Sequence, residues 1–151
     1  MRLYLVQHAE AKSEAEDPAR PLTDKGRADA ERMAKFAAKY LGVRPRAVFH
    51  SGKLRARQTA EIFAKHLGVE GEPLETNHLE PLADPRVWAD RLREFGEDVM
   101  LVGHLPHLSK LASLLLRGSE EPEVVKFRMA GVVCLERGGE GRWVLNWAVW
   151  P

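Results

Sequence analysis

Three short apolar runs, each leading through a polar residue towards an amphipathic segment, limit most strongly how this chain can fold. They cover residues 3–6, 46–50 and 97–103. Each run is about as long as a strand, and the segments that follow place apolar residues at the three- and four-residue spacing of a helix. Strands that alternate with helices favour a largely parallel sheet, so we expect an α/β fold. Such folds bind ligands beyond the carboxyl ends of their strands.

The remaining segments complete this fold. Helices are expected at residues 24–41, 53–67, 85–95 and 106–117. Further strands are expected at residues 73–76, 124–128, 131–136 and 143–150, the last two joined by a glycine-rich hairpin. Thr23 and Ser51 are candidate N-terminal caps of the first two helices. We therefore predict one domain over residues 1–151: a three-layer α/β/α sandwich with a mostly parallel central sheet and antiparallel C-terminal strands.

Composition and charge narrow the possible function classes. The chain has 151 residues, enough to bury a sizeable core in one domain. Lys plus Arg number 23 against 22 acidic residues, so the global charge indicates no preference for nucleic acid or membranes. The lone cysteine, Cys134, lies in an apolar run, where we expect an inert core thiol. Because we see no signal pattern and no apolar span of ~18 residues, we expect a cytoplasmic protein.

Polar side chains of matching chemistry follow the three apolar runs. His8 follows the first run, His104 follows the third, and Arg55 lies in the first turn of the helix after the second. Parallel strands end at one edge of a sheet, so these side chains should converge beside helix N-termini, where free N–H groups favour an anion. A neutral imidazole there can attack phosphorus, while an arginine offers a fork of donors to phosphoryl oxygens. The pattern indicates phosphoryl chemistry that needs no metal.

Four motifs, in this order and spacing, carry a resemblance that covers nearly the whole chain. They are LVQHAEA, RPLTDKG, SGKLRARQTA and VGHLP. The sequence resembles the histidine phosphatase (phosphoglycerate-mutase-like) superfamily, and within it the small SixA-type phosphohistidine phosphatases. The resemblance implies that His8 is the nucleophile that becomes phosphorylated and that His104 is the second catalytic histidine. It also implies that Arg55 binds the phosphate and that Arg20 borders the phosphate pocket.

The chain departs from the superfamily's opening signature, Arg-His-Gly, because it reads Gln7-His8-Ala9. Gln7 can still bind a phosphoryl oxygen through its amide, but it carries no charge. We expect phosphate binding to weaken by roughly 1.5–3 kcal/mol if Gln7 makes only a neutral hydrogen bond. Arg20 offsets part of this loss. Ala9 in place of glycine disfavours a positive φ at that position. Since both histidines and Arg55 remain, we expect activity to survive.

These features predict a hydrolase of signal transduction, a phosphatase that acts on protein phosphohistidine through a phospho-His8 intermediate. It would need no metal or other cofactor, and its partner would be a phosphohistidine-bearing protein. Two alternatives stay open. The first is a phosphomonoesterase for a small phosphorylated substrate. The second is a regulatory phosphate-binding module in which Gln7 has weakened catalysis.

Other polar residues are open to more than one interpretation. Glu80 is a positional candidate for a general acid, and a surface-loop role explains it equally well. His104 and His107 could form half of a zinc site, but no Cys or carboxylate follows at ligand spacing, which disfavours a metal. We expect His50 to orient backbone or a neighbouring side chain beside the pocket. The two remaining histidines, His66 and His78, are expected to be solvated.

Overall fold

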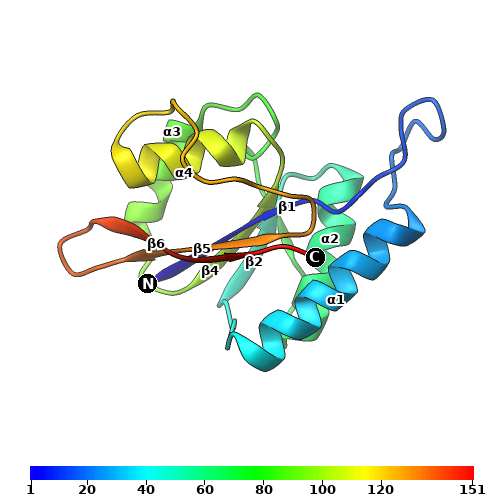
Figure 1. Ribbon diagram of the computed structural model, residues 1–151, viewed down its shortest axis with the longest axis horizontal. Coiled ribbons are helices and arrows are strands. Elements are labelled where there is room, and N and C mark those ends of the chain that lie inside the picture. Colours follow the sequence, from blue (N-terminus) through cyan, green and yellow to red (C-terminus); the bar gives the residue numbers. More distant parts are fainter.

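A six-stranded mixed sheet lies between two pairs of helices (Figure 1). The computed structural model describes all residues 1–151. The strands are β1 (Arg2–Gln7), β2 (Ala47–His50), β3 (Leu74–Glu75), β4 (Val99–Gly103), β5 (Val132–Arg137) and β6 (Trp143–Val149). The helices are α1 (Asp24–Tyr40), α2 (Leu54–Leu67), α3 (Pro85–Arg91) with the short 3-10 helix η1 (Leu92–Glu94), and α4 (His107–Arg117). None of them is long and apolar enough to cross a membrane.

The order of the strands separates a parallel part of the sheet from an antiparallel part. The order is β3-β2-β4-β1-β5-β6. β2 runs parallel to both β3 and β4, and β4 runs parallel to β1. β5 pairs antiparallel with β1, and β6 pairs antiparallel with β5. The mostly parallel sheet with antiparallel C-terminal strands is therefore confirmed, and β1, β2 and β4 end at one edge.

Each face of the sheet has its own core, because side chains alternate between the faces along a strand. Tyr4 and Val6 of β1 pack with buried residues of α1 and α2 on one face. Leu3 and Leu5 pack with buried residues of α3 and α4 on the other face. Figure 1 shows the two helix pairs on opposite sides of the sheet. The central parallel strands are thus covered on both sides, which explains why they read as continuous apolar runs.

The strand predicted at residues 124–128 is wrong. This segment forms no strand, and β6 already occupies the position beside β5 at that edge. Val125 and Phe127 are buried in the core under α3 and α4, whereas the residues on either side of each are exposed. The alternation of burial therefore comes from side chains that anchor an irregular segment over the core, and this pattern imitates a half-buried strand.

The start of α1 is fixed to the backbone that follows β1. Thr23 caps the helix as predicted, since its side chain accepts a hydrogen bond from the N–H of Gly26 at 3.0 Å. The Thr23 N–H in turn donates to the carbonyl of Glu10 at 3.0 Å. Gly26 lies so close to this carbonyl that an added Cβ would come within 2.1 Å of the Glu10 oxygen. The helix thus holds the segment just beyond His8 in place.

We predict that Gly26→Ala destabilises the protein, although alanine in place of glycine normally stabilises the interior of a helix. The new methyl group would overlap the Glu10 carbonyl and push α1 away from it, at a cost of about 2 kcal/mol in the free energy of unfolding. Urea denaturation measures this change. Gly96→Ala is the matched control, because an added Cβ there meets nothing within 4 Å. Equal stability of the two variants would contradict the close approach.

Candidate active site

Two histidines meet at the edge where β1 and β4 end. His8 directly follows β1. Its backbone N–H donates to the carbonyl of Gly103 at 3.0 Å, which extends the β1–β4 ladder by one residue. His104 directly follows β4. The centroids of the two imidazole rings lie 5.1 Å apart, with 51° between the ring planes. The structure thus brings the two predicted histidines together.

One hydrogen bond sets the reactive face of His8. Its Nδ1 lies 2.7 Å from the carbonyl oxygen of Ala9. A carbonyl only accepts, so Nδ1 must carry the proton, and the lone pair is left on Nε2. The Ala9 N–H donates to Thr59 of α2 at 3.0 Å, so α2 anchors this short segment. Ala9 is not among the residues with positive φ, so alanine costs no backbone strain there.

His8 is held neutral at physiological pH. Burial lowers its pKa most, and the positive charges of Arg55 and Arg20 lower it as well. Against the opposing effect of the Ala9 carbonyl, they bring the pKa to about 4. No carboxylate contributes to the shift of this pKa. A neutral ring with a free Nε2 lone pair is the form that can attack an electrophile.

His104 is almost fully covered, with 1% of its surface exposed. Its Nε2 lies 2.6 Å from the hydroxyl oxygen of Ser51, and its Nδ1 is buried without a partner. Burial lowers its pKa to about 3, helped by the nearby charges of His8, Arg55 and Lys53. The prediction that Ser51 caps α2 is wrong, because Lys53 occupies that position and the Ser51 hydroxyl faces His104.

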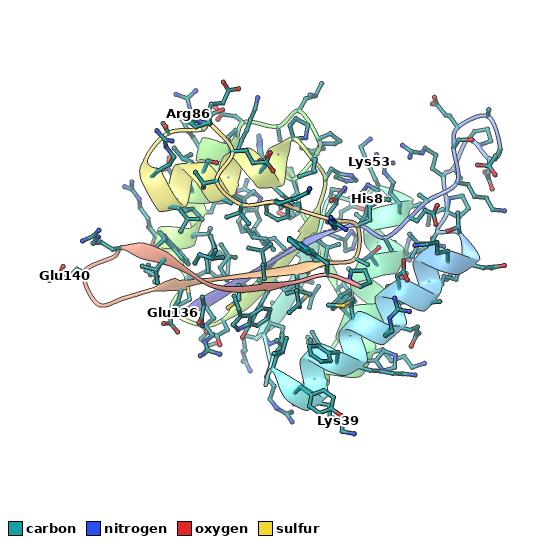
Figure 2. The ribbon with its side chains drawn as sticks, viewed as in Figure 1. His8, Lys39, Lys53, Arg86, Glu136 and Glu140 are labelled. Atoms are coloured by element: carbon teal, nitrogen blue, oxygen red, sulfur yellow. The ribbon has the colours of Figure 1, made fainter.

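Three cations gather beside the histidines. Arg20, Lys53 and Arg55 line one open cavity of about 370 Å³, together with a single acidic residue, Glu14. Arg55 has its Nε buried without a protein partner, and burial together with Arg20 lowers its pKa. Arg20 holds a left-handed backbone (φ 50°), and its Nε donates to the Lys12 carbonyl at 3.0 Å. Sequence reasoning missed Lys53, whose charge acts on His104 and whose label lies beside that of His8 in the view of Figure 2. The cluster is suited to a small anion with several oxygens.

Comparison with known proteins agrees with this arrangement. Residues 3–80 match the model of the histidine phosphatase superfamily (branch 1). An uncharacterized protein of Picosynechococcus sp. is 33% identical over 146 residues, which cover 91% of this chain and 86% of that protein. The chain belongs to the histidine phosphatase superfamily.

Solved structures show which members of the superfamily the chain resembles in sequence and fold. The protein histidine phosphatase SixA, complexed with tungstate, is 26% identical, with a TM-score of 0.86 over 99% of this chain and 97% of that one. A SixA-type protein of Agrobacterium tumefaciens is 25% identical, with a TM-score of 0.79 and the same coverage. An α-ribazole-5′-P phosphatase of Escherichia coli, 18% identical with a TM-score of 0.77 over 97% of this chain and 94% of that one, shares the fold. Within the superfamily, the chain is therefore similar to the SixA phosphatases in sequence and in fold.

Gln7, where the superfamily signature has arginine, lines a different groove from the three cations. This groove has a volume of about 540 Å³ and also includes Leu105, the residue after His104. The Gln7 Oε1 is buried without a partner, and Nε2 is not among the buried unpartnered atoms. Its amide N–H groups are therefore the part that a ligand can reach. Contact between Gln7 and a phosphoryl group stays a prediction.

The remaining polar residues lie outside the pair of histidines. His50 accepts a hydrogen bond from the Gly52 N–H at 3.1 Å and so orients backbone, as predicted. The Glu80 carboxylate accepts a hydrogen bond from the backbone N–H of His78 at 3.3 Å. Its negative charge also raises the pKa of His107, against the effect of burial. His66 was predicted to be solvated, but its ring forms a hydrogen bond with the Glu31 carboxylate. No three His, Cys, Asp or Glu side chains come together in a way that could hold a metal ion.

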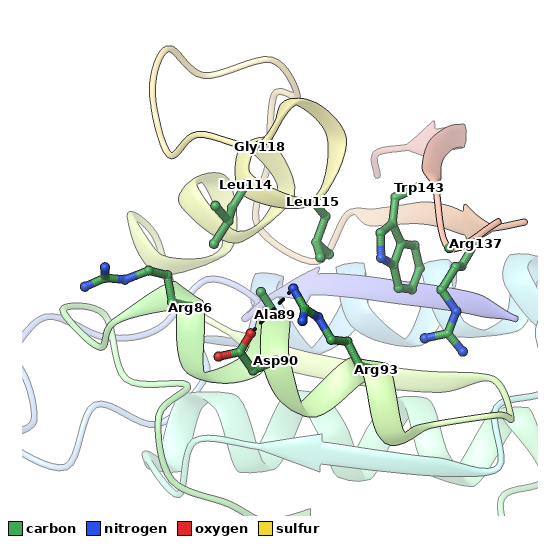
Figure 3. Close-up of a pocket in the computed structure, with 10 residues that line it drawn as sticks. Arg86, Ala89, Asp90, Arg93, Leu114, Leu115, Gly118, Arg137 and Trp143 are labelled. Carbon is green, nitrogen blue, oxygen red and sulfur yellow. Dashed lines mark ion pairs between the residues drawn. The ribbon is translucent and has the colours of Figure 1, made fainter.

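The largest groove, drawn in Figure 3, has no histidine among the residues that line it. It has a volume of about 700 Å³ and lies among α3, α4 and the β5–β6 hairpin. Its arginines already have partners. Arg86 pairs with Asp84, and Arg93 pairs with Asp90. Arg137 donates to the backbone carbonyls of Leu92 and Phe95, at the start of η1 and just after it. No predicted site residue lines this groove, so size alone does not mark the site.

We predict that stability falls steeply as the pH drops from about 6.5 towards 4. His8, His104 and His107 have folded-state pKa values of about 4, 3 and 4, against 6.5 for a free imidazole. Between those values the unfolded chain binds more protons than the folded chain, so acid favours unfolding. Thermal melts across this range measure the dependence.

The substitution His107→Leu isolates the contribution of one histidine to this pH dependence and leaves His8 and His104 unchanged. His107 is fully buried with both ring nitrogens unpartnered, although Glu80 and Asp84 partly oppose the effect of burial on its pKa. The melting temperature of the variant should depend less on pH than that of the wild type. An unchanged dependence would contradict a buried neutral His107.

Proposed function

We propose that this SixA-like protein hydrolyses phosphohistidine on another protein, through a phosphorylated His8. In the first step the Nε2 of His8 attacks phosphorus, a new P–N bond forms, and the substrate imidazole leaves with the electrons of the broken bond. In the second step water attacks phosphorus and the bond to His8 breaks. Phosphate departs, and His8 returns to its neutral form with the proton still on Nδ1.

The cations stabilise the phosphoryl group through both steps. Arg20, Lys53 and Arg55 surround it with positive charge where negative charge is spread over its oxygens. Gln7 adds amide donors from the side of the neighbouring groove. The related SixA structure holds tungstate, an oxyanion with a shape similar to phosphate, which supports an oxyanion as a ligand of this chain as well. Arginine and lysine supply the charge that a metal would otherwise provide, so activity should persist in a chelator.

The choice of substrate is supported by the charges around His8, because no carboxylate contributes to the shift of its pKa and the cation cavity is lined by one acidic residue, Glu14. The charged groups that act on this imidazole are Arg55 and Arg20, and Glu80 lies beside His107 instead. An alkoxide leaving group needs a proton donor, which a carboxylic acid beside the leaving oxygen, on the side of phosphorus opposite His8, would supply. A phosphohistidine whose other ring nitrogen carries a proton leaves as neutral imidazole without that help. Phospho-His8 has the same character, because Ala9 holds the proton on its Nδ1.

Turnover measurements test the proposal. We expect kcat/KM for a phosphohistidine-bearing protein to exceed that for a panel of sugar and nucleotide phosphates by at least two orders of magnitude. His8→Ala should abolish turnover and the labelled phosphoenzyme. If sugar or nucleotide phosphates are the better substrates, the small-molecule phosphomonoesterase replaces this proposal. If neither turnover nor a labelled intermediate is found, only a phosphate-binding role is left.

Gln7→Arg should raise turnover about tenfold, because a charged donor binds a phosphoryl oxygen more strongly than a neutral amide. Gln7→Met, which has similar length and no donor, is the matched control and should lower turnover. Steady-state kinetics on the same phosphohistidine substrate measures both variants. An unchanged rate in Gln7→Arg would show that Arg20 and Lys53 already supply the charge.

A further inference from the structure

The groove that Gln7 lines continues from the candidate active site. Gln7 and Leu105 both line it, and they are the chain neighbours of His8 and His104. The cation cavity includes neither of these two residues. A ligand whose phosphoryl group lies beside His8 can therefore extend along this groove, which has a volume of about 540 Å³.

One side of the groove is apolar. Leu105, Phe127 and Met129 line it there. Phe127 is buried in the core under α3 and α4, whereas Met129, two residues later, is 44% exposed. Methionine is flexible and polarisable, so it can adapt to apolar side chains of different shapes on a binding surface. The groove therefore offers an apolar contact that the fold itself leaves uncovered.

The segment that bears Met129 is fixed to the end of β1. The Ala130 N–H donates to the Gln7 carbonyl at 2.9 Å, and the Gly131 N–H donates to the Arg128 carbonyl at 2.9 Å. Ala130 is buried and holds a left-handed backbone, with φ 64°, which costs energy for a residue other than glycine. The backbone thus presents Arg128 and Met129 in one position, so little ordering is needed when a ligand binds.

Arg128 provides a positive charge that no carboxylate of the protein neutralises. Lys25 and Arg32 of α1 also line the groove, but both pair with Asp29, at 2.8 and 2.9 Å. The guanidinium carbon of Arg128 lies 5.0 Å from the centre of the Trp150 ring. This stacking holds the guanidinium in place and leaves its N–H groups free to bind a carboxylate.

The acidic residues of the groove do not cancel this charge. They are Asp29, which already has two cationic partners, and Glu10, whose carboxylate accepts a hydrogen bond from the Thr23 hydroxyl at 3.1 Å. Two acids stand against three cations in the lining of the groove. An acidic side chain on a ligand would therefore meet a complementary charge at Arg128.

We propose that this groove binds the polypeptide segment that flanks the phosphohistidine of the substrate protein, with an acidic side chain on Arg128 and an apolar side chain on Met129. The inference rests on the proposed function, because it assigns the leaving group to a protein. It makes Arg128 and Met129 specificity-determining residues. The cation cavity then binds the phosphoryl group, and the groove recognises the sequence around it.

Binding of short synthetic peptides tests this inference without requiring turnover. Each peptide bears a non-hydrolysable phosphonate analogue of phosphohistidine beside a leucine, with an aspartate placed in turn at successive positions on either side. The matched peptides have lysine in place of aspartate, and affinities are measured by fluorescence anisotropy. At one of these positions we expect about tenfold tighter binding of the aspartate peptide, a preference that salt weakens. Equal affinity for both peptides at every position would overturn the proposal.

Substitutions of Arg128 test which side chain recognises the charge. Arg128→Gln should reduce the preference to within about twofold, and Arg128→Glu should reverse it in favour of the lysine peptide. Arg142→Glu is the matched control and should keep the wild-type preference. Arg142 is exposed and lies in the β5–β6 hairpin, whose Glu140 is far from His8 in Figure 2. A preference that survives in Arg128→Glu, or is lost equally in Arg142→Glu, would overturn the proposal.

The apolar contact has its own test. Met129→Ser should weaken binding of the preferred aspartate peptide about fivefold, and replacing the peptide's leucine by serine should then cost little more. Val144→Ser is the control, because Val144 is 53% exposed on β6 but does not line the groove. Equal effects of the two substitutions would contradict a specific contact at Met129.

Binding and turnover separate this inference from the proposed function. If the wild-type protein binds the aspartate peptide with the expected preference but does not hydrolyse the corresponding phosphohistidine peptide, only the proposed function fails. If it hydrolyses phosphohistidine peptides regardless of the acidic residue, and binds the analogues equally well, only this inference fails.

Discussion

The parallel pairing of β1 with β4, extended by the His8 N–H to the Gly103 carbonyl, is the contact on which the site depends. This ladder aligns the ends of the two strands, so that His8 and His104 leave the sheet side by side. A shift of one residue would turn every side chain of β1 to the other face and bury polar groups in the two cores. The same register that fills the cores therefore also sets the distance between the two imidazoles.

The site combines positive charge with neutral imidazoles. Burial keeps His8 and His104 uncharged, and the nearby cations act in the same direction, so the lone pair on His8 is preserved. Burial also leaves donors without partners, such as the Nε of Arg55. Buried polar groups without hydrogen-bond partners lower the stability of the unliganded protein. A phosphoryl group that binds there would accept these hydrogen bonds and restore that stability. The acid sensitivity expected of the fold follows from the same arrangement.

Most of the fold can be predicted from the sequence, because apolar runs, Thr23 and the glycine-rich hairpin are local signals. The convergence of His8, Arg55, Arg20 and His104 followed from parallel topology and from the resemblance. The prediction for residues 124–128 was wrong, because alternate burial does not require a strand partner. The hydrogen bond between Ser51 and His104 was missed, because the two residues lie 53 positions apart along the chain. Lys53 was missed because a lone lysine before a helix usually faces solvent, and the position of Gln7 in a separate groove depends on three-dimensional contacts.

The most direct test of this account asks which atom of the protein becomes phosphorylated. The hydrogen bond from Nδ1 of His8 to Ala9 leaves Nε2 as the only nitrogen of that ring able to attack phosphorus. The phosphoenzyme can be trapped with labelled phosphohistidine substrate, quenched in base to preserve the P–N bond, and assigned by ¹H–³¹P NMR. The account predicts a single adduct on Nε2 of His8. A phosphoryl group on Nδ1 of His8, or on any other residue, would contradict it.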